Sequence, residues 1–176
     1  MKATVLFLLL CLCLPLASQD KKPATLRDIL LEELRNTHDN KDWFVPANVA
    51  VQGLTAEQAK WTDGSGNHSV GQLANHLVFW NRQALAKFKG EPTAKFDGNN
   101  DETFNGFNSA QWDATVKQLD QVMADWEKAV QAADDKKLAE WASTISHVGQ
   151  HNAYHIGQMV FVRKLQGSWD PNKGVK

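Results

Sequence analysis

The chain has 176 residues, with 19 lysine and arginine side chains against 20 aspartate and glutamate side chains, and a formal net charge of -1. Its apolar content of 43% and aromatic content of 9% are typical of one globular domain. Because the basic residues form no cluster, the charge pattern argues against a nucleic-acid partner, whose phosphates need a basic surface. Both cysteines, Cys11 and Cys13, lie at the N-terminus, so a processed chain has no disulfide, cysteine nucleophile or thiolate metal ligand.

The N-terminus predicts an export signal. Lys2 precedes an apolar run over residues 3–16, which is shorter than the roughly 20 residues that a membrane-spanning helix needs. We therefore expect a secretory signal peptide at residues 1–18 and a mature domain at 19–176, located in the periplasm or outside the cell. Retention of the segment as an uncleaved anchor is the alternative.

The first predicted helix begins after Thr25, a candidate N-cap with Asp28 three residues later, and fades near His38. Its apolar side chains follow helical spacing: Leu26, Ile29, Leu30 and Leu34. Residues 39–64 contain proline and glycine, which predicts a long crossover connection. Two short helical pieces fall within it: 46–52 and 55–60.

A capping-box pattern at Ser69 and Gln72 predicts the start of the second long helix. Apolar residues and one histidine then repeat every three or four positions: Leu73, His76, Leu77, Trp80, Ala84 and Phe88. Residues 89–107 are rich in glycine, asparagine, proline and threonine and show no sustained period. We expect a surface loop there, long enough to carry function.

The second half of the chain predicts two more long helices. One starts at Asn108 or Ser109 and alternates apolar steps of four and three residues: Trp112, Val116, Leu119, Met123, Trp126 and Val130. The last runs from about residue 137 to 165, and Gly167 and Pro171 mark its end. No strand-like alternation competes with these patterns, so the sequence predicts an all-α four-helix bundle with a long crossover between its first and second helices.

Three histidines lie four residues apart on the last predicted helix. Successive members of the set His147, His151 and His155 are rotated by only about 40°, so they form one stripe. We expect the stripe to face the interior, because apolar residues flank it: Ile145, Val148, Ile156 and Met159 on one side, Tyr154, Phe161 and Leu165 on the other. The opposite arc, expected to face water or a close neighbour, is mostly small or polar: Ser146, Gly149, Ala153, Val160 and Lys164.

An inward stripe of imidazoles predicts a metal site. Hydrogen bonds to core partners usually explain a single buried histidine, and that explanation stays open here. Stacked imidazoles, however, need either protons that repel one another or a cation that binds their neutral form. His76, in the apolar stripe of the second helix, adds a ligand from a facing helix and leaves positions open for water or substrate. Nitrogen ligation suits zinc, nickel, copper or iron.

Two motifs resemble the metal-binding motifs of the DinB/YfiT-like family: SVGQLANHLVFW, which contains His76, and HNAYHIGQ, which contains His151 and His155. The segment THDNKDWFVPANVAVQGLTAEQAKW also resembles that family, and the similarity covers about residues 26–165. The resemblance implies a bundle, often a homodimer, that holds a divalent zinc or nickel ion on His76, His151 and His155.

His147 lies one turn before the motif and is an additional position. We interpret it as a proton acceptor beside the metal, with plain packing as the alternative. Gln158 lies on the same face as His151 and is expected to orient a ligand or a metal-bound water. His38 and His68 lie outside the stripe, and the sequence leaves open whether they are ordinary surface or cap residues.

A three-histidine metal with open positions lowers the pKa of bound water, which predicts a metal-dependent hydrolase of an unknown small-molecule substrate. The inward faces of the histidine motifs carry no carboxylate, so a carboxylate base would come from Asp63, Asp97, Asp101 or Glu102. The first alternative is a non-enzymatic metal- or ligand-binding module, closed by His147 as a fourth ligand. The second is a metal-dependent transferase like the thiol-using relatives of the family, although export argues against cytosolic thiols. The third is a polar histidine core without a metal.

Overall fold

The computed structural model describes residues 22–93 and 95–174, and the regular elements of this part are all helical. They are α1 (Leu26–His38), α2 (Ala47–Val51), α3 (Ala56–Lys60), α4 (Val70–Lys89), α5 (Glu102–Asn105), α6 (Trp112–Ala132) and α7 (Asp135–Gln166), with 3₁₀ turns at Ser109–Gln111 and Pro171–Lys173. None of the described helices is long and apolar enough to cross a membrane. The expected signal peptide, residues 1–18, lies outside the described residues.

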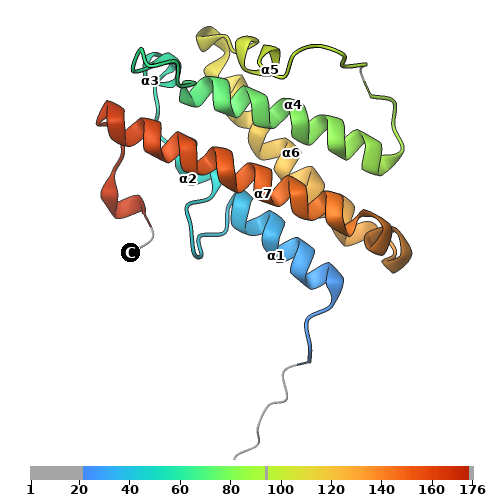
Figure 1. The fold of residues 1–176 in the computed structure, drawn as a ribbon. Coiled ribbons are helices and arrows are strands. Elements are labelled where there is room, and N and C mark those ends of the chain that lie inside the picture. The colour runs from blue at the N-terminus through green and yellow to red at the C-terminus, as the bar shows by residue number, and fades with distance from the viewer. Residues whose placement is uncertain (1–21, 94, 175–176) are drawn as a thin grey trace, which may run out of the picture.

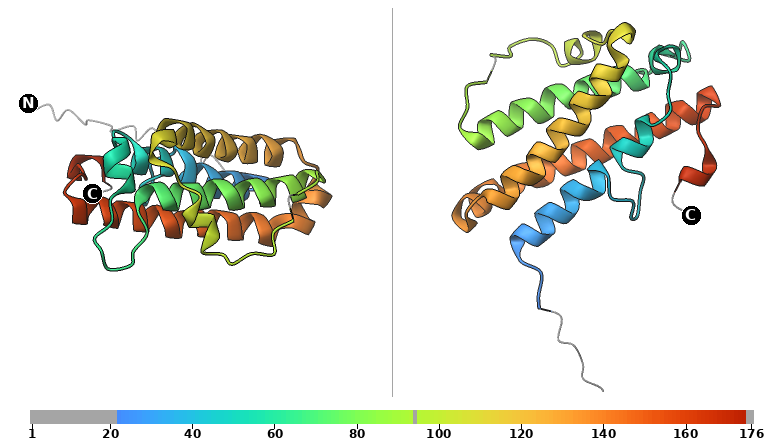
Figure 2. Two further views of the ribbon diagram at one scale, coloured as in Figure 1. Left: turned by 90° about the horizontal axis from the view of Figure 1, so that it is seen from above. Right: turned by 180° about the vertical axis from the view of Figure 1, so that it is seen from behind.

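The four long helices form the all-α bundle that the sequence predicts (Figure 1). Helices α1 and α4 each pack against both α6 and α7. Helices α1 and α7 run in one direction, and α4 and α6 run in the other (Figure 2). The crossover with α2 and α3 connects α1 to α4, and α5 packs on α4 before the chain enters α6. The facing surfaces of α4 and α7 therefore come from distant parts of the sequence.

Local capping explains where the long helices begin and end. At α1, the Thr25 hydroxyl accepts the backbone N–H of Asp28, whose carboxylate accepts the N–H of Thr25. Ser69 and Gln72 form the same reciprocal pair at α4. Gly167 ends α7 with a φ of +77°, a left-handed conformation that favours glycine. These three signals confirm the corresponding boundaries expected from sequence.

The exposed side of α7 differs from the prediction. Tyr154, Phe161 and Leu165 are 64%, 56% and 49% exposed, so their expected inward orientation is wrong. Helix α1 packs instead on the opposite arc, where Gly149 is buried and a Cβ would lie 2.7 Å from the Glu33 side chain. The other predicted flank is largely in the core: Ile145, Ile156 and Met159. The approach of α1 thus decides which face of α7 is buried.

Arg163 holds the crossover against α7. Its side chain is buried, and the guanidinium donates hydrogen bonds to the carbonyl oxygens of Ala50 at 2.7 Å, Gln52 at 3.1 Å and Ser168 at 2.9 Å. These carbonyls lie at and beyond helix ends, where the backbone has no helical partner. One buried cation therefore satisfies acceptors from two segments, and the sequence pattern did not single it out.

Candidate metal centre

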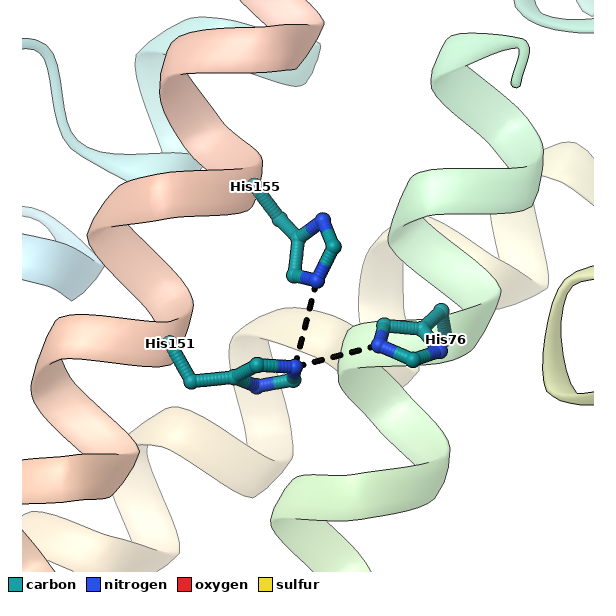
Figure 3. A group of neighbouring side chains, drawn as sticks. All are labelled: His76, His151 and His155. Atoms are coloured by element: carbon teal, nitrogen blue, oxygen red, sulfur yellow. Dashed lines mark hydrogen bonds between the residues drawn. The ribbon is translucent and has the colours of Figure 1, made fainter. Parts of the chain in front are cut away.

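Three histidines converge between α4 and α7 (Figure 3). His76 lies on α4, and His151 and His155 lie one turn apart on α7. The Nε2 atom of His151 is 3.1 Å from Nε2 of His76 and 3.1 Å from Nε2 of His155. His76 and His155 are buried, and His151 is half-buried. The structure thus brings together the three residues expected as ligands.

The nitrogen spacing fits a metal ion. Zinc lies about 2.0–2.1 Å from histidine nitrogens, so two such nitrogens at octahedral to tetrahedral angles are about 2.9–3.4 Å apart. The two separations of 3.1 Å fall within this range. All three ligand atoms lie within 4.8 Å of one another, and no fourth His, Cys, Asp or Glu of the described residues joins this group.

Hydrogen bonds at the far ring nitrogens orient two of the imidazoles. The Thr103 hydroxyl donates to the Asn100 carbonyl oxygen at 2.6 Å, so its oxygen accepts the Nδ1–H of His76 at 2.5 Å. The amide oxygen of Gln158 accepts the Nδ1–H of His155 at 2.6 Å. Both rings therefore present an Nε2 lone pair to the third ring. Metal-binding histidines are typically supported in this way.

Hydrogen bonds among the three rings cannot satisfy all of the converging Nε2 atoms. A single N–H at Nε2 of His151 cannot point at both neighbouring lone pairs. Burial, followed by repulsion between the imidazoles, lowers the pKa of His76 to about 3 and that of His151 to about 4. Burial also lowers the pKa of His155, although its hydrogen bond to Gln158 opposes this effect. The three rings are therefore neutral near pH 7 and offer converging lone pairs, a donor set that suits a divalent cation.

Helix α5 contributes residues that the sequence did not reveal. It lies within the segment 89–107, for which only a loop was expected, and its Thr103 and Phe104 are buried. The Phe104 ring stacks on His76 with centroids 3.9 Å apart, and on His68 with centroids 3.8 Å apart. His68 therefore packs behind the site. A helix of four residues has no measurable period, so the length of the loop was the available signal.

A groove of about 540 Å³ lies beside the three histidines. Trp80, Phe104 and Tyr154 contribute aromatic walls. His147 is exposed and lines the same groove, but it does not belong to the converging group. The acidic residues considered as a base do not line it: Asp63, Asp97, Asp101 and Glu102. Apart from the three converging histidines and Tyr154, His147 is the titratable side chain among the described lining residues.

His38 lies in a second, separate cluster. It is 5% exposed, with Nδ1 at 2.6 Å from Oε1 of Glu127 and Nε2 at 2.9 Å from Oδ1 of Asp120. His38 is therefore not an ordinary surface residue, because α6 covers this side chain and supplies both carboxylates.

Comparison with known proteins agrees with the motifs. A family model for the DinB superfamily matches residues 47–160, which include His76, His151 and His155. Neither the curated proteins nor the solved structures contain a significant match. The family match covers more than half of the chain and confirms the resemblance found in its motifs. This chain belongs to the DinB superfamily.

Proposed function

We propose that this protein binds a divalent transition metal ion, zinc or nickel, through His76, His151 and His155, and uses it to hydrolyse a small-molecule substrate. The observation that carries the proposal is the convergence of three Nε2 atoms, at least two of which present lone pairs, without a fourth described ligand, beside a groove. A bound divalent ion with open positions supplies a Lewis acid that activates water near neutral pH.

The surrounding residues have separate tasks in this proposal. Thr103 and Gln158 hold the rings of His76 and His155 in the tautomer that binds through Nε2. Burial keeps the rings neutral, so metal uptake need not displace protons from them near pH 7. His147 lines the groove and accepts the proton that hydrolysis releases from water.

The number of ligands favours catalysis over a purely structural role. Structural zinc sites are almost always closed by four protein ligands, whereas catalytic sites use three and keep a position open. His147 was the candidate for a closing ligand, and it stands outside the converging group. A non-enzymatic binding module is therefore the outcome that the activity test below would reveal.

Metal uptake is the first test. Metal-free protein would be loaded with zinc or nickel, and the bound metal measured by mass spectrometry after gel filtration. We expect one ion per chain in the wild type and in His147→Ala, and none in His155→Ala. His147→Ala is the matched control because it removes an imidazole one turn earlier on the same helix. Circular dichroism would verify that both variants keep their helices. A wild type that takes up neither metal, or a His155→Ala variant that binds fully, would overturn the proposal.

Turnover is the second test. The metal-loaded protein would be offered panels of uncharged esters and amides, with the metal-free protein and His147→Ala as controls. We expect hydrolysis that requires the metal and decreases in His147→Ala while its metal content stays unchanged. A fully loaded protein that hydrolyses none of them would overturn the hydrolase assignment and favour the binding module. Consumption that depends on an added thiol would instead indicate a transferase.

We also propose that the protein is exported. The proposal rests on Lys2 and the apolar run over residues 3–16. Fractionation of the native cells and mass spectrometry of the mature N-terminus test it. We expect a chain that begins near residue 19 in the exported fraction, and an uncleaved chain in the cytoplasm would contradict the proposal.

A further inference from the structure

The groove beside the three converging histidines is elongated, and its long axis follows α4 and α7. Helix α4 lines it with His76, Trp80 and Ala84, which are successive turns of one helix face. The antiparallel helix α7 lines it from His155 to Thr144. The groove therefore starts at the three imidazoles and extends about 12 Å along α4, from His76 to Ala84, and about 16 Å along α7, from His155 to Thr144. Small side chains, Ala84 and Thr144, lie at the end away from the histidines.

The walls of this groove are mainly aromatic, aliphatic and imidazole side chains. No Asp, Glu, Lys or Arg occurs among the described residues that line it. Trp80, Phe104 and Val148 present apolar surface, and the indole N–H of Trp80 is already donated to the side-chain oxygen of Asn100 at 3.1 Å. A charged group that lay along Trp80 and Val148, away from the proposed metal, would lose water without meeting an oppositely charged Asp, Glu, Lys or Arg side chain of the described lining. Burial of apolar ligand surface in the groove, in contrast, would stabilise the complex in proportion to the area removed from water.

The two ends of the groove differ in what they recognise. One end of the groove is formed by the three converging histidine nitrogens. With a metal ion bound there, this end would accept a chemical group that coordinates the metal. Between the histidines and Ala84, the aromatic and aliphatic walls match an uncharged hydrocarbon or aromatic body. A volume of about 540 Å³ lies in the range of small-molecule sites.

We infer that the substrate class of this protein is an elongated small molecule with an uncharged apolar body and one polar, metal-coordinating head. The head lies at His76, His151 and His155, and the body extends along Trp80 toward Ala84. This inference rests on the proposed metal site. It specifies the chemical character of the part of the substrate that does not coordinate the metal.

Hydroxamic acids of increasing length test the inference, because the same head binds the metal in every member. Acetohydroxamic, butyrohydroxamic and hexanohydroxamic acids would be titrated into zinc-loaded protein by isothermal calorimetry. We expect the affinity to rise about threefold for each added methylene group. Adipic acid monohydroxamate, which has the length of the hexanoyl compound but ends in a carboxylate, is expected to bind at least about tenfold more weakly than that compound.

A groove-filling variant locates the body. Ala84→Leu narrows the far end of the groove while keeping a good helix former, and Ala114→Leu makes the same change at an exposed position of α6. We expect Ala84→Leu to reduce hexanohydroxamate affinity about tenfold and to leave acetohydroxamate affinity unchanged. Ala114→Leu is expected to bind the whole series like the wild type.

The outcomes separate the two proposals. A protein that takes up no zinc overturns the proposed metal function and, with it, the position of the head. Zinc-loaded protein whose affinity stays flat along the series, or that binds the carboxylate-ended compound as tightly as the hexanoyl one, overturns the apolar-body inference alone. Equal hexanohydroxamate affinity in Ala84→Leu and Ala114→Leu overturns the assigned direction.

Discussion

His38 and His76 are both buried histidines on bundle helices, yet their partners differ. Both ring nitrogens of His38 face carboxylates, those of Glu127 and Asp120. His76 faces the Thr103 hydroxyl on one side and other imidazoles on the other. Burial disfavours the charged ring in both places. At His38 the hydrogen bonds to the two carboxylates outweigh burial and raise the pKa, whereas at His76 nothing offsets it and the pKa falls to about 3.

The comparison distinguishes an ion pair from a candidate metal site. His38, Asp39 and Glu127 also lie close enough together to hold a metal ion by spacing alone. In that cluster, however, each nitrogen of the imidazolium donates to an acceptor, and the partner Asp120 has a lowered pKa because of His38. In the other cluster, His76 and His155 donate their ring protons outward from Nδ1, so at most one proton, on His151, lies among the three converging Nε2 atoms. The positions of the ring protons therefore distinguish the His38 cluster from the three converging histidines, although the spacing of the candidate ligand atoms is similar in the two clusters.

Removal of one of the three converging histidines is expected to have the largest effect, a loss of zinc affinity. His151→Ala deletes the ring that lies 3.1 Å from both of its partners. Zinc affinity, measured by competition with a chromogenic chelator, is expected to fall more than about 100-fold. His38→Ala is the contrasting control and should keep wild-type zinc affinity. A zinc affinity that depends on His38 and not on His151 would reverse the assignment of the two clusters.

The second perturbation targets the ion pair. His38→Ala leaves Glu127 and Asp120 facing each other without the imidazolium, and we expect the free energy of unfolding to fall by about 2 kcal/mol, since Asp120 is partly solvated. Urea unfolding of the metal-free protein measures this change. Arg35→Ala is the matched control, because Arg35 is 3.5 Å from the same Glu127 but half exposed. It should cost less than about 1 kcal/mol. Equal losses in the two variants would contradict a special role for His38.

A smaller effect is expected at the support of His76. Thr103→Val removes the oxygen that accepts the Nδ1–H of His76 and preserves the shape of the side chain. We expect zinc affinity to fall about tenfold, because the ring is no longer held in its binding orientation. Thr93→Val, on the same connection between α4 and α6, is the control and should bind zinc like the wild type. If both variants bind equally well, the hydroxyl does not position the ring.

The smallest effect concerns pH, and its sign differs between the clusters. The raised pKa of His38 stabilises the fold fully below the unfolded value of about 6.5, and this stabilisation is lost as pH rises through the folded pKa. The pKa of His151, lowered to about 4, destabilises the metal-free fold as pH falls from about 6.5 toward 4. In urea titrations, the deficit of His38→Ala should therefore be larger at low pH. The deficit of His151→Ala should shrink on acidification, and parallel pH profiles for the two variants would refute the assigned charge states.

Local signals were sufficient for most of the helices. Thr25 with Asp28 and Ser69 with Gln72 form the expected caps, because a cap involves groups only three residues apart. The periodicity of apolar residues likewise predicted α4, α6 and α7. The four-residue helix α5 was missed, since so short an element has no period and depends on its packing against α4.

The candidate site was predictable in part. His151 and His155 share a face because four residues make about one helical turn, a property of the chain alone. That His76 belongs with them required the apolar stripe and the motif resemblance, and the structure confirms their proximity. Thr103 and Phe104 could not be linked to His76 from sequence, because nothing local relates residues on separate elements.

The long helices, their caps and the spacing of the histidines follow from the local sequence, since they depend on neighbours within about one turn. The charge of His38 and the face of α7 that is buried depend on contacts between helices. Helix α1 buried Gly149 and left Tyr154 exposed, and α6 turned an ordinary histidine at the end of α1 into a buried imidazolium. The physical reason is that burial and proton affinity depend on which elements meet in space, and no pattern along a single helix contains that information.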